Sequence, residues 1–227
     1  MAKRELIVLG TAAPSPTAER GQSSYALRWD DRFYVFDPGE NTQRQMMKAG
    51  LHITRTGRVF ITHFHGDHCL GLPGLVQRWR LFGAGGRLAL HYPSWGREAI
   101  DRLVYGSAID FDLSIDHVPI DPGETQHHDG LAITALELDH TVPTVGWRLA
   151  QPPEPHLLPE PLARLGIEGE AIGRLKHEGS IEHRGRTVTL DEVSEYRPGP
   201  TFAFVMDTRV CANAIELARG ADLLVAE

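Results

Sequence analysis

The sequence predicts a layered α/β fold with mixed sheets, and two observations support this prediction. Short apolar or alternating runs of strand length recur along the 227 residues, together with shorter segments of helical spacing. The 23 glycines and 15 prolines indicate many turns between short elements, which excludes a helix bundle or a fibrous protein. A chain of this length can bury a real core, which excludes disorder.

The expected elements are short and are bounded by glycine, proline or polar residues. Strands are expected at residues 5–9, 24–29, 33–36, 58–61, 88–92, 131–138, 144–149, 201–205 and 222–226. Helices are expected at residues 42–49, 72–82, 95–105 and 210–219. The dipeptide Asp129-Gly130 predicts a hairpin turn, so we expect His127 and His128 to lie at a solvated turn rather than at a metal.

Residues 150–199 differ in composition from the rest of the chain and predict a flexible insertion, which we call the arm. Five prolines lie between residues 152 and 161, and a charged, weakly periodic stretch follows them. We therefore expect the first half of the core at residues 1–149 and the start of its second half at 200–227. Because the last expected strand, at residues 222–226, is followed by Glu227 alone and has no cap, we expect the chain to be part of a longer protein.

Charge is distributed unevenly along the chain. The formal net charge is -7, yet residues 1–100 contain 13 Lys and Arg against 8 Asp and Glu, while residues 101–227 contain 10 against 22. A polyanion would therefore meet the first half. Only Cys69 and Cys211 are present, and no apolar run suits a membrane span or a signal peptide. We expect a cytoplasmic protein with packed thiols and no membrane contact.

The strongest chemical signal is a cluster of four metal-ligand side chains directly after the strand expected at residues 58–61. His63 and His65 alternate at the strand end and can face one ion, while Asp67 and His68 can turn toward a second. Imidazole and carboxylate ligands suit Zn²⁺. The alternative is a polar loop whose histidines bond to backbone, but groups packed this densely would repel one another or stay unsatisfied without a cation.

Two further ligand candidates follow other expected strands. His140 comes after the strand at residues 131–138, and Asp207 comes after the strand at 201–205. Strand ends are where sites assemble in α/β sheets. Taken alone, such a histidine is usually structural and such an aspartate often caps a helix. Together with the first cluster, both become the favoured additional ligands.

The HxHxDH motif with a distant His and a distant Asp resembles the metallo-β-lactamase superfamily and, within it, the tRNase Z family of tRNA 3′-processing endonucleases. Residues 9–11, 36–45 and 62–75 are similar to that family, and the resemblance covers essentially the whole chain. It implies an αββα sandwich with an inserted arm and an incomplete second half.

The resemblance implies two Zn²⁺ ions per chain and a role for each candidate ligand. The six ligands would be His63, His65 and His140 at one ion, Asp67 and His68 at the other, and Asp207 as the bridge. Two such ions can generate a hydroxide and clamp both oxygens of a phosphodiester, and Asp67 would orient that nucleophile or accept its proton. Asp37 and Glu40, in the similar segment after another strand, are expected to support the ligating imidazoles.

Three features depart from the family pattern. The loop expected to lie near the tRNA 3′ end keeps Pro16 and Arg20 but lacks its Lys and Asn, which leaves Arg20 as the candidate RNA contact. The Gly-Pro hallmark of the arm is replaced by Gly169-Glu170, and residues 150–199 contain six Lys and Arg against nine Asp and Glu. The last metal-binding His and a helper His of the family would lie beyond Glu227.

We therefore expect a zinc-dependent endoribonuclease that removes the 3′ trailer from precursor tRNA by metal-hydroxide attack on a phosphodiester. The resemblance implies a homodimer in which one arm holds tRNA for the partner's site, and no DNA partner. Two alternatives stay open: a metal-dependent hydrolase of small phosphodiesters, which the acidic arm favours, and an inactive truncated remnant. The sequence does not decide the substrate, the physiological metal or any preference for precursors without CCA.

Overall fold

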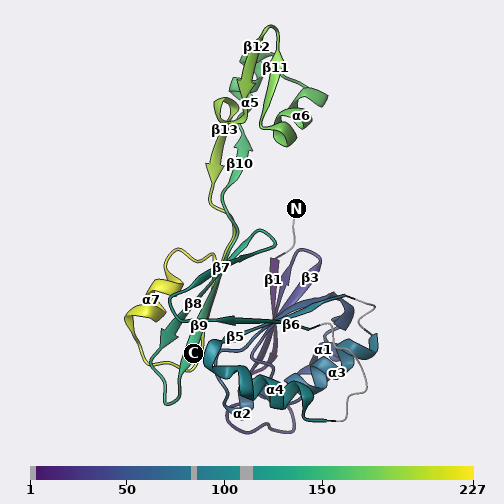
Figure 1. Cartoon of the computed structure of the whole chain (residues 1–227), viewed down its shortest axis with the longest axis vertical. Helices are drawn as coiled ribbons and strands as arrows, with labels where there is room; N and C mark the ends of the chain where they lie inside the picture. Colours follow the sequence, from purple (N-terminus) through teal and green to yellow (C-terminus); the bar gives the residue numbers. More distant parts are fainter. Residues whose placement is uncertain (1–3, 83–85, 108–114) are drawn as a thin grey trace.

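The computed structural model describes residues 4–82, 86–107 and 115–227. In these residues two β-sheets lie face to face with helices on their outer sides, and the arm projects from one end of the sandwich (Figure 1). This arrangement confirms the expected αββα sandwich with mixed sheets.

The first sheet contains, among the described residues, six strands in chain order. These are β1 (Arg4–Gly10), β2 (Ser24–Trp29), β3 (Arg32–Phe36), β4 (Thr56–Phe60), β5 (Leu88–Pro93) and β6 (Ile115–Ile120). The strands β1, β2 and β3 pair antiparallel, whereas β3, β4, β5 and β6 pair parallel. The carboxyl ends of β3 and β4 therefore lie at one edge of the sheet, where the expected ligand segments begin.

The second sheet has five strands within the described part of the chain, in the order β15, β14, β9, β8 and β7. Their bounds are β7 (Thr125–His128), β8 (Leu131–Leu138), β9 (Thr144–Ala150), β14 (Thr201–Val205) and β15 (Leu223–Ala226). The β7–β8 hairpin turns at Asp129 and Gly130, whose φ angles are 50° and 76°. The expected turn therefore forms, with His127 and His128 at the end of β7.

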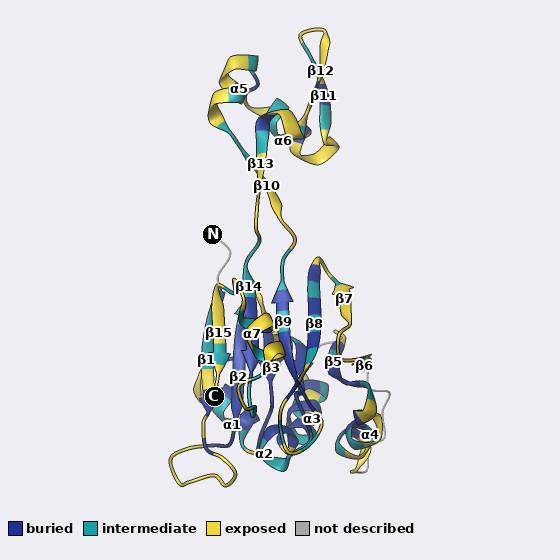
Figure 2. Cartoon of the chain, turned by 90° about the vertical axis from the view of Figure 1, so that its left-hand side faces the viewer, coloured by how far each residue is buried: buried dark blue, intermediate teal, exposed yellow. Residues whose placement is uncertain are grey.

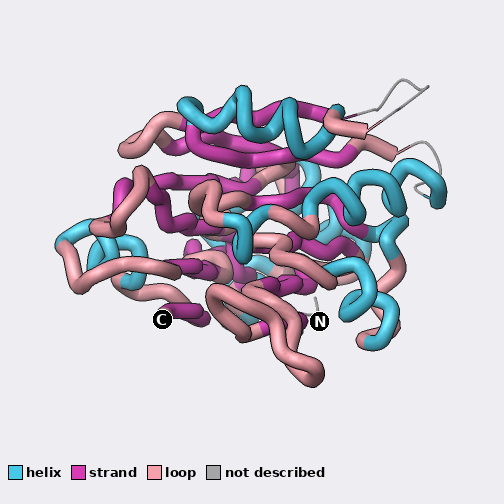
Figure 3. The backbone as a smooth tube through the Cα atoms, turned by 90° about the horizontal axis from the view of Figure 1, so that it is seen from below, coloured by secondary structure: helices cyan, strands magenta, loops and turns pink. Residues whose placement is uncertain are grey.

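Helices cover the outer face of each sheet (Figure 3). The helices of the sandwich are α1 (Thr42–Lys48), α2 (Gly66–Cys69), α3 (Leu72–Phe82), α4 (Arg97–Tyr105) and α7 (Ala212–Ala218), with short 3₁₀ turns η1 (Ile53–Arg55) and η2 (Ser94–Gly96). Leu72 and Leu75 of α3 pack with Val59 of β4 in the core under the first sheet. Leu217 of α7 packs against Val205 on the second sheet.

Aromatic side chains fill the space between the two sheets. Because side chains alternate along a strand, Val59 faces the helices while the next residue, Phe60, faces the second sheet. Phe60 stacks on Phe36 with ring centroids 4.7 Å apart, and Phe36 lies 4.9 Å from Phe204 of the second sheet. These contacts fix β3 and β4 against β14; β4 and β14 lead into expected ligands, and β3 leads into Asp37.

The arm has its own secondary structure and its own small core. Its elements are β10 (Glu154–Leu157), α5 (Pro159–Leu165), α6 (Glu170–Glu178), β11 (Ser180–His183), β12 (Arg186–Thr189), η3 (Leu190–Val193) and β13 (Ser194–Arg197). Leu162, Leu175 and Val188 are buried together in it. The arm stands clear of the sandwich on a neck made of two chain segments (Figure 2).

In the part of the chain that the structure describes, no helix is both long enough and apolar enough to cross a bilayer.

Two glycines let the turn after β3 approach the start of α3. A Cβ atom on Gly71 would lie 1.9 Å from the carbonyl oxygen of Gly39, and one on Gly39 would lie 2.1 Å from the carbonyl oxygen of Asp67. The Gly71 N–H donates to the Pro38 carbonyl at 2.8 Å. These close approaches hold the segment containing Asp37 against the segment containing Asp67 and His68.

We predict that Gly71→Ala lowers the free energy of unfolding by about 1–3 kcal/mol, because the methyl group would force two backbone segments apart. Gly173→Ala is the matched control: Gly173 is an exposed residue inside α6 with open space around it. That change should stabilise the protein by about 0.5–1 kcal/mol. Urea denaturation measures both values, and equal stabilities of the two variants would contradict the proposed contact.

Candidate metal centre

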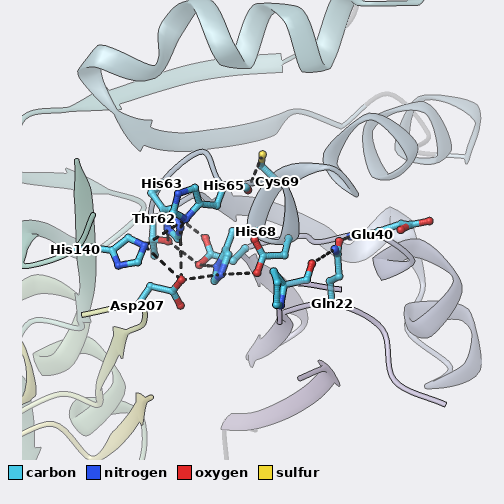
Figure 4. Close-up of polar contacts among 12 residues, drawn as sticks. Gln22, Glu40, Thr62, His63, His65, His68, Cys69, His140 and Asp207 are labelled. Atoms are coloured by element: carbon cyan, nitrogen blue, oxygen red, sulfur yellow. Dashed lines mark hydrogen bonds and ion pairs between the residues drawn. The ribbon is translucent and has the colours of Figure 1, made fainter. Parts of the chain in front are cut away.

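The candidate ligands come together at one end of the sandwich, from both sheets (Figure 4). His63 and His65 lie in the loop after β4, and His68 lies in the single-turn helix α2. His140 lies between β8 and β9, and Asp207 lies two residues after the end of β14. The structure thus joins residues that are up to 144 positions apart in the sequence.

One group of potential ligands consists of His63, His65, His140 and Asp207, whose ligand atoms all lie within 4.8 Å of one another. His63 Nε2 lies 3.0 Å from His65 Nδ1, and His140 Nε2 lies 3.3 Å from the same nitrogen. Asp207 Oδ2 lies 3.7 Å from both His63 Nε2 and His140 Nε2. Nitrogens and a carboxylate oxygen that converge this closely form a suitable donor set for a cation.

The second group surrounds His68, whose two ring nitrogens face different partners. Nδ1 lies 2.9 Å from Asp37 Oδ2. Nε2 lies 3.3 Å from Asp207 Oδ2 and 3.6 Å from Asp67 Oδ2, and it is buried without a hydrogen-bond partner. A buried ring nitrogen aimed at two carboxylates fits a shared cation, so the residues present match the requirement for a metal.

Asp37 is completely buried, and its hydrogen bonds connect the segment after β4 with helix α2. Its Oδ1 accepts the Thr62 backbone N–H at 2.8 Å, and its Oδ2 accepts the Thr62 hydroxyl at 2.7 Å as well as the His68 Nδ1–H. Both carboxylate oxygens are occupied by these donors. Asp37 therefore holds His68 with Nε2 directed at the centre.

Thr62 is a residue that the sequence analysis did not select. Its Oγ1 lies 2.9 Å from His63 Nδ1, and because this hydroxyl already donates to Asp37 it accepts the Nδ1–H. The arrangement leaves His63 Nε2 with its lone pair toward the centre. The available signal was the position of Thr62 directly before the first histidine of the motif.

The protonation of the two buried histidines moves in opposite directions. Burial lowers the pKa of His63 to about 4. Burial also opposes charge on His68, but its close contacts with the Asp207 and Asp37 carboxylates, and their charges, outweigh burial and raise its pKa to about 10. The contact with His68 lowers the pKa of Asp207. The carboxylates thus stabilise a positive charge at His68, the property that a metal site requires.

Asp37 and Asp207 share an unusual backbone conformation. Their φ angles are 44° and 51°, in the left-handed region that aspartate tolerates better than most residues. Each of them ends a strand that leads into the centre. Local strain of this kind is typical of residues held in place for function.

The remaining candidates lie outside the cluster. Glu40 has an exposed side chain, and its backbone N–H rather than its carboxylate makes a contact, at 2.9 Å to Gln22 Oε1 (Figure 4). Arg20 is exposed in the loop of residues 13–20, and its backbone N–H donates to Thr17 Oγ1 at 3.0 Å. Cys69 is buried and donates to the His65 carbonyl, and burial raises the pKa of its thiol to about 12.

A pocket of about 550 Å³ opens beside the cluster, with His65, Asp67 and Asp207 in its wall. Asp67 is half-buried there. A carboxylate at this position faces both the ligand cluster and the open space of the pocket. It can therefore hold a water molecule or take up a proton from it.

Comparison with known proteins identifies the relatives of this chain. A model of the metallo-beta-lactamase superfamily matches residues 17–210. The chain is 48% identical over 229 residues to Ribonuclease Z of Nocardia farcinica, covering all of this chain and 75% of the relative. It is 47% identical over 230 residues to Ribonuclease Z of Thermobifida fusca, covering all of this chain and 72% of the relative.

Solved structures share the fold at lower identity. The short form of human tRNase Z aligns with a TM-score of 0.62 and 22% identity, over 96% of this chain and 76% of that protein. A diphosphatase from the PhnP family aligns with a TM-score of 0.60 and 15% identity, over 98% of this chain and 73% of that protein.

We predict that Asp37→Ala weakens metal binding by about 10- to 100-fold, because His68 loses the acceptor that orients it. The same change should lower the free energy of unfolding by at least about 2 kcal/mol, since buried donors lose their partner. Asp37→Asn, which keeps one acceptor oxygen, serves as a milder second variant. Competition with a chelating dye and urea denaturation measure the two effects.

Glu40→Ala is the matched control for this prediction, because Glu40 lies in the same turn with an exposed carboxylate. It should leave both metal affinity and stability unchanged. Equal metal affinities of the Asp37 and Glu40 variants would show that the Asp37 contact does not support the centre.

Proposed function

This chain belongs to the ribonuclease Z family of the metallo-β-lactamase superfamily, and we propose that it is a zinc-dependent endoribonuclease that removes the 3′ trailer from precursor tRNA. Family membership makes it a metal-dependent hydrolase. The observation that carries the proposal is the position of Asp207 Oδ2, which lies within 3.7 Å of histidines from both ligand groups.

The ligands divide naturally between two zinc ions. His63, His65 and His140 would hold one ion, and Asp67 and His68 would hold the other. Asp207 would bridge them, since one of its two carboxylate oxygens, Oδ2, faces both groups. Mixed imidazole and carboxylate ligands support zinc, and the pocket beside the cluster leaves room for substrate.

The residues of this chain would divide the work of hydrolysis. Two bound zinc ions would lower the pKa of a water molecule and stabilise the charge on a phosphodiester. Asp67, in the pocket wall, would orient the attacking water or accept its proton. Asp37 and Thr62 would keep the His68 and His63 rings in the required tautomers. The products would be a tRNA with a 3′-hydroxyl and a trailer with a 5′-phosphate.

The arm supports a macromolecular substrate and a homodimer. It leaves the sandwich at the end opposite α2 and so projects away from the metal centre of its own chain (Figure 1). An arm placed in this way can hold RNA for the centre of a second copy. The proposal therefore includes a homodimer whose substrate is precursor tRNA.

A second candidate function, hydrolysis of small phosphodiesters, is favoured by the charge of the arm. Its six Lys and Arg face nine Asp and Glu, and Arg174, Arg186 and Arg197 are already paired with glutamates of the arm. A clamp for a polyanion gains affinity from unpaired basic residues. The two functions differ in whether the arm contributes to substrate binding.

We predict that Asp207→Ala lowers the zinc content at both sites, to fewer than one ion per chain, because the shared ligand is lost. Asp139→Ala is the control, since the nearby Asp139 is exposed and pairs with Arg209 instead of the cluster. Elemental analysis of purified protein measures the zinc content. Two zinc ions per chain in the Asp207 variant would show that this residue is not the bridge.

We predict that deleting residues 155–197 raises the KM for precursor tRNA about tenfold or more, because remote binding energy positions the scissile bond. Turnover of bis(p-nitrophenyl) phosphate should stay nearly unchanged, since the deletion removes no proposed ligand and the arm has its own core. Steady-state kinetics on both substrates measure the effect. Equal KM values with and without the arm would favour the small-substrate function.

A further inference from the structure

We propose that the pocket beside the metal centre contains a nucleobase subsite, with Pro14 and Leu70 as its apolar walls and Gln22 as the residue that positions Pro14. This inference rests on the proposed function, because the base would belong to a nucleotide next to the scissile phosphate. It assigns a role to residues that are not proposed metal ligands.

The pocket is lined by two chemically different kinds of residue. Asp67 and Asp207 belong to the ligand cluster, whereas Pro14 and Leu70 are apolar. The Leu70 side chain is 56% exposed although it directly follows the buried Cys69. Apolar walls next to a few convergent polar groups are typical of sites that bind small organic groups.

The charges around the pocket select a base rather than a second phosphate. Among the described residues that line it, the charged side chains are the carboxylates Asp67 and Asp207, and Lys or Arg is absent. Both carboxylates are proposed metal ligands, so a second phosphate placed against Pro14 and Leu70 would have no basic partner in the pocket. The uncharged face of a nucleobase needs no such partner and can pack against proline and leucine.

Gln22 fixes the wall that Pro14 forms. Its side chain is buried, with 7% exposure, and both ends of its amide are used. Nε2 donates to the Pro14 carbonyl at 2.8 Å, and Oε1 accepts the Glu40 N–H at 2.9 Å. Gln22 therefore ties an exposed loop to the turn that follows Asp37.

The loop has few other anchors near Pro14. Residues 13–20 are all exposed, and the Ala12 N–H donates to the Gly21 carbonyl at 2.9 Å to close the neck of the loop. The amide of Gln22 thus holds Pro14 to the turn that contains Glu40. We assign Gln22 as a positioning residue that acts on the substrate through Pro14.

The test compares Leu70→Ala and Gln22→Ala with Leu81→Ala, a matched control because Leu81 is 69% exposed on α3 and lines a different pocket. Each protein is titrated with fluorescently labelled precursor tRNA, intact or with one abasic nucleotide on either side of the scissile bond. Fluorescence anisotropy gives Kd, and steady-state cleavage gives kcat and KM separately. Thermal denaturation checks that each variant is folded.

The subsite predicts a non-additive result. Leu70→Ala should raise the Kd for intact precursor about fivefold, the scale of one partly buried apolar side chain. One of the two abasic substitutions should weaken binding to the wild-type protein by a similar factor. Leu70→Ala should bind that abasic RNA no more weakly than it binds the intact RNA. Gln22→Ala should show the same pattern in Kd and KM with kcat unchanged, whereas a merely structural role would change kcat and the melting temperature together.

Equal Kd values for the Leu70 and Leu81 variants would overturn the subsite. The subsite would also be overturned if the loss of affinity caused by Leu70→Ala multiplied independently with the loss caused by each of the two abasic substitutions. In both cases cleavage of precursor tRNA by wild type would leave the proposed function intact. A wild-type protein that neither binds nor cleaves precursor tRNA would refute the proposed function and the subsite with it.

Discussion

The buried carboxylate of Asp37 is the contact on which the arrangement of the metal centre depends. It binds Thr62 and His68 at once, and Thr62 in turn contacts His63. Two imidazoles from different segments are therefore oriented by one group that is itself inaccessible to solvent. The glycine contacts between residues 39 and 71 keep this carboxylate within reach of α2. Removing the Asp37 carboxylate would leave several buried donors without a partner at the same time.

Much of the sandwich could be predicted from the sequence because its strands are apolar and of ordinary length. The expected strands at residues 24–29, 131–138 and 201–205 and the helix at 72–82 match the structure residue for residue. The strands β6 and β7 were missed because His117, His127 and other polar residues interrupt their apolar pattern. The elements of the arm were missed because all seven are short, with lengths of four to nine residues, which leaves little room for a periodic pattern.

The candidate centre was predictable where ligands lie close in the sequence and less so where they are held by distant contacts. The spacing of His63, His65, Asp67 and His68 predicted two neighbouring ion sites from the sequence alone. His140 and Asp207 were found because both follow strands. The different surroundings of Asp37 and Glu40 could not be predicted, because burial is decided by the packing of the turn against Gln22 and Gly71. The role of Thr62 could not be predicted, because it depends on a hydroxyl that lies between the Asp37 and His63 side chains.

The origin of the ligands in both sheets has a consequence for how the protein is made. Synthesis proceeds from the amino terminus, so His63, His65 and His68 leave the ribosome long before the chain reaches Asp207. Until β14 pairs with β9, the first sheet of the nascent chain carries a group of imidazoles and carboxylates that lacks Asp207 Oδ2, the oxygen that faces both ligand groups. Contacts across so many residues form slowly because a long loop must close first. Closure of the second sheet over a half-built centre is therefore a late step of assembly. A cofactor that binds to the first ligands would be enclosed only after that closure.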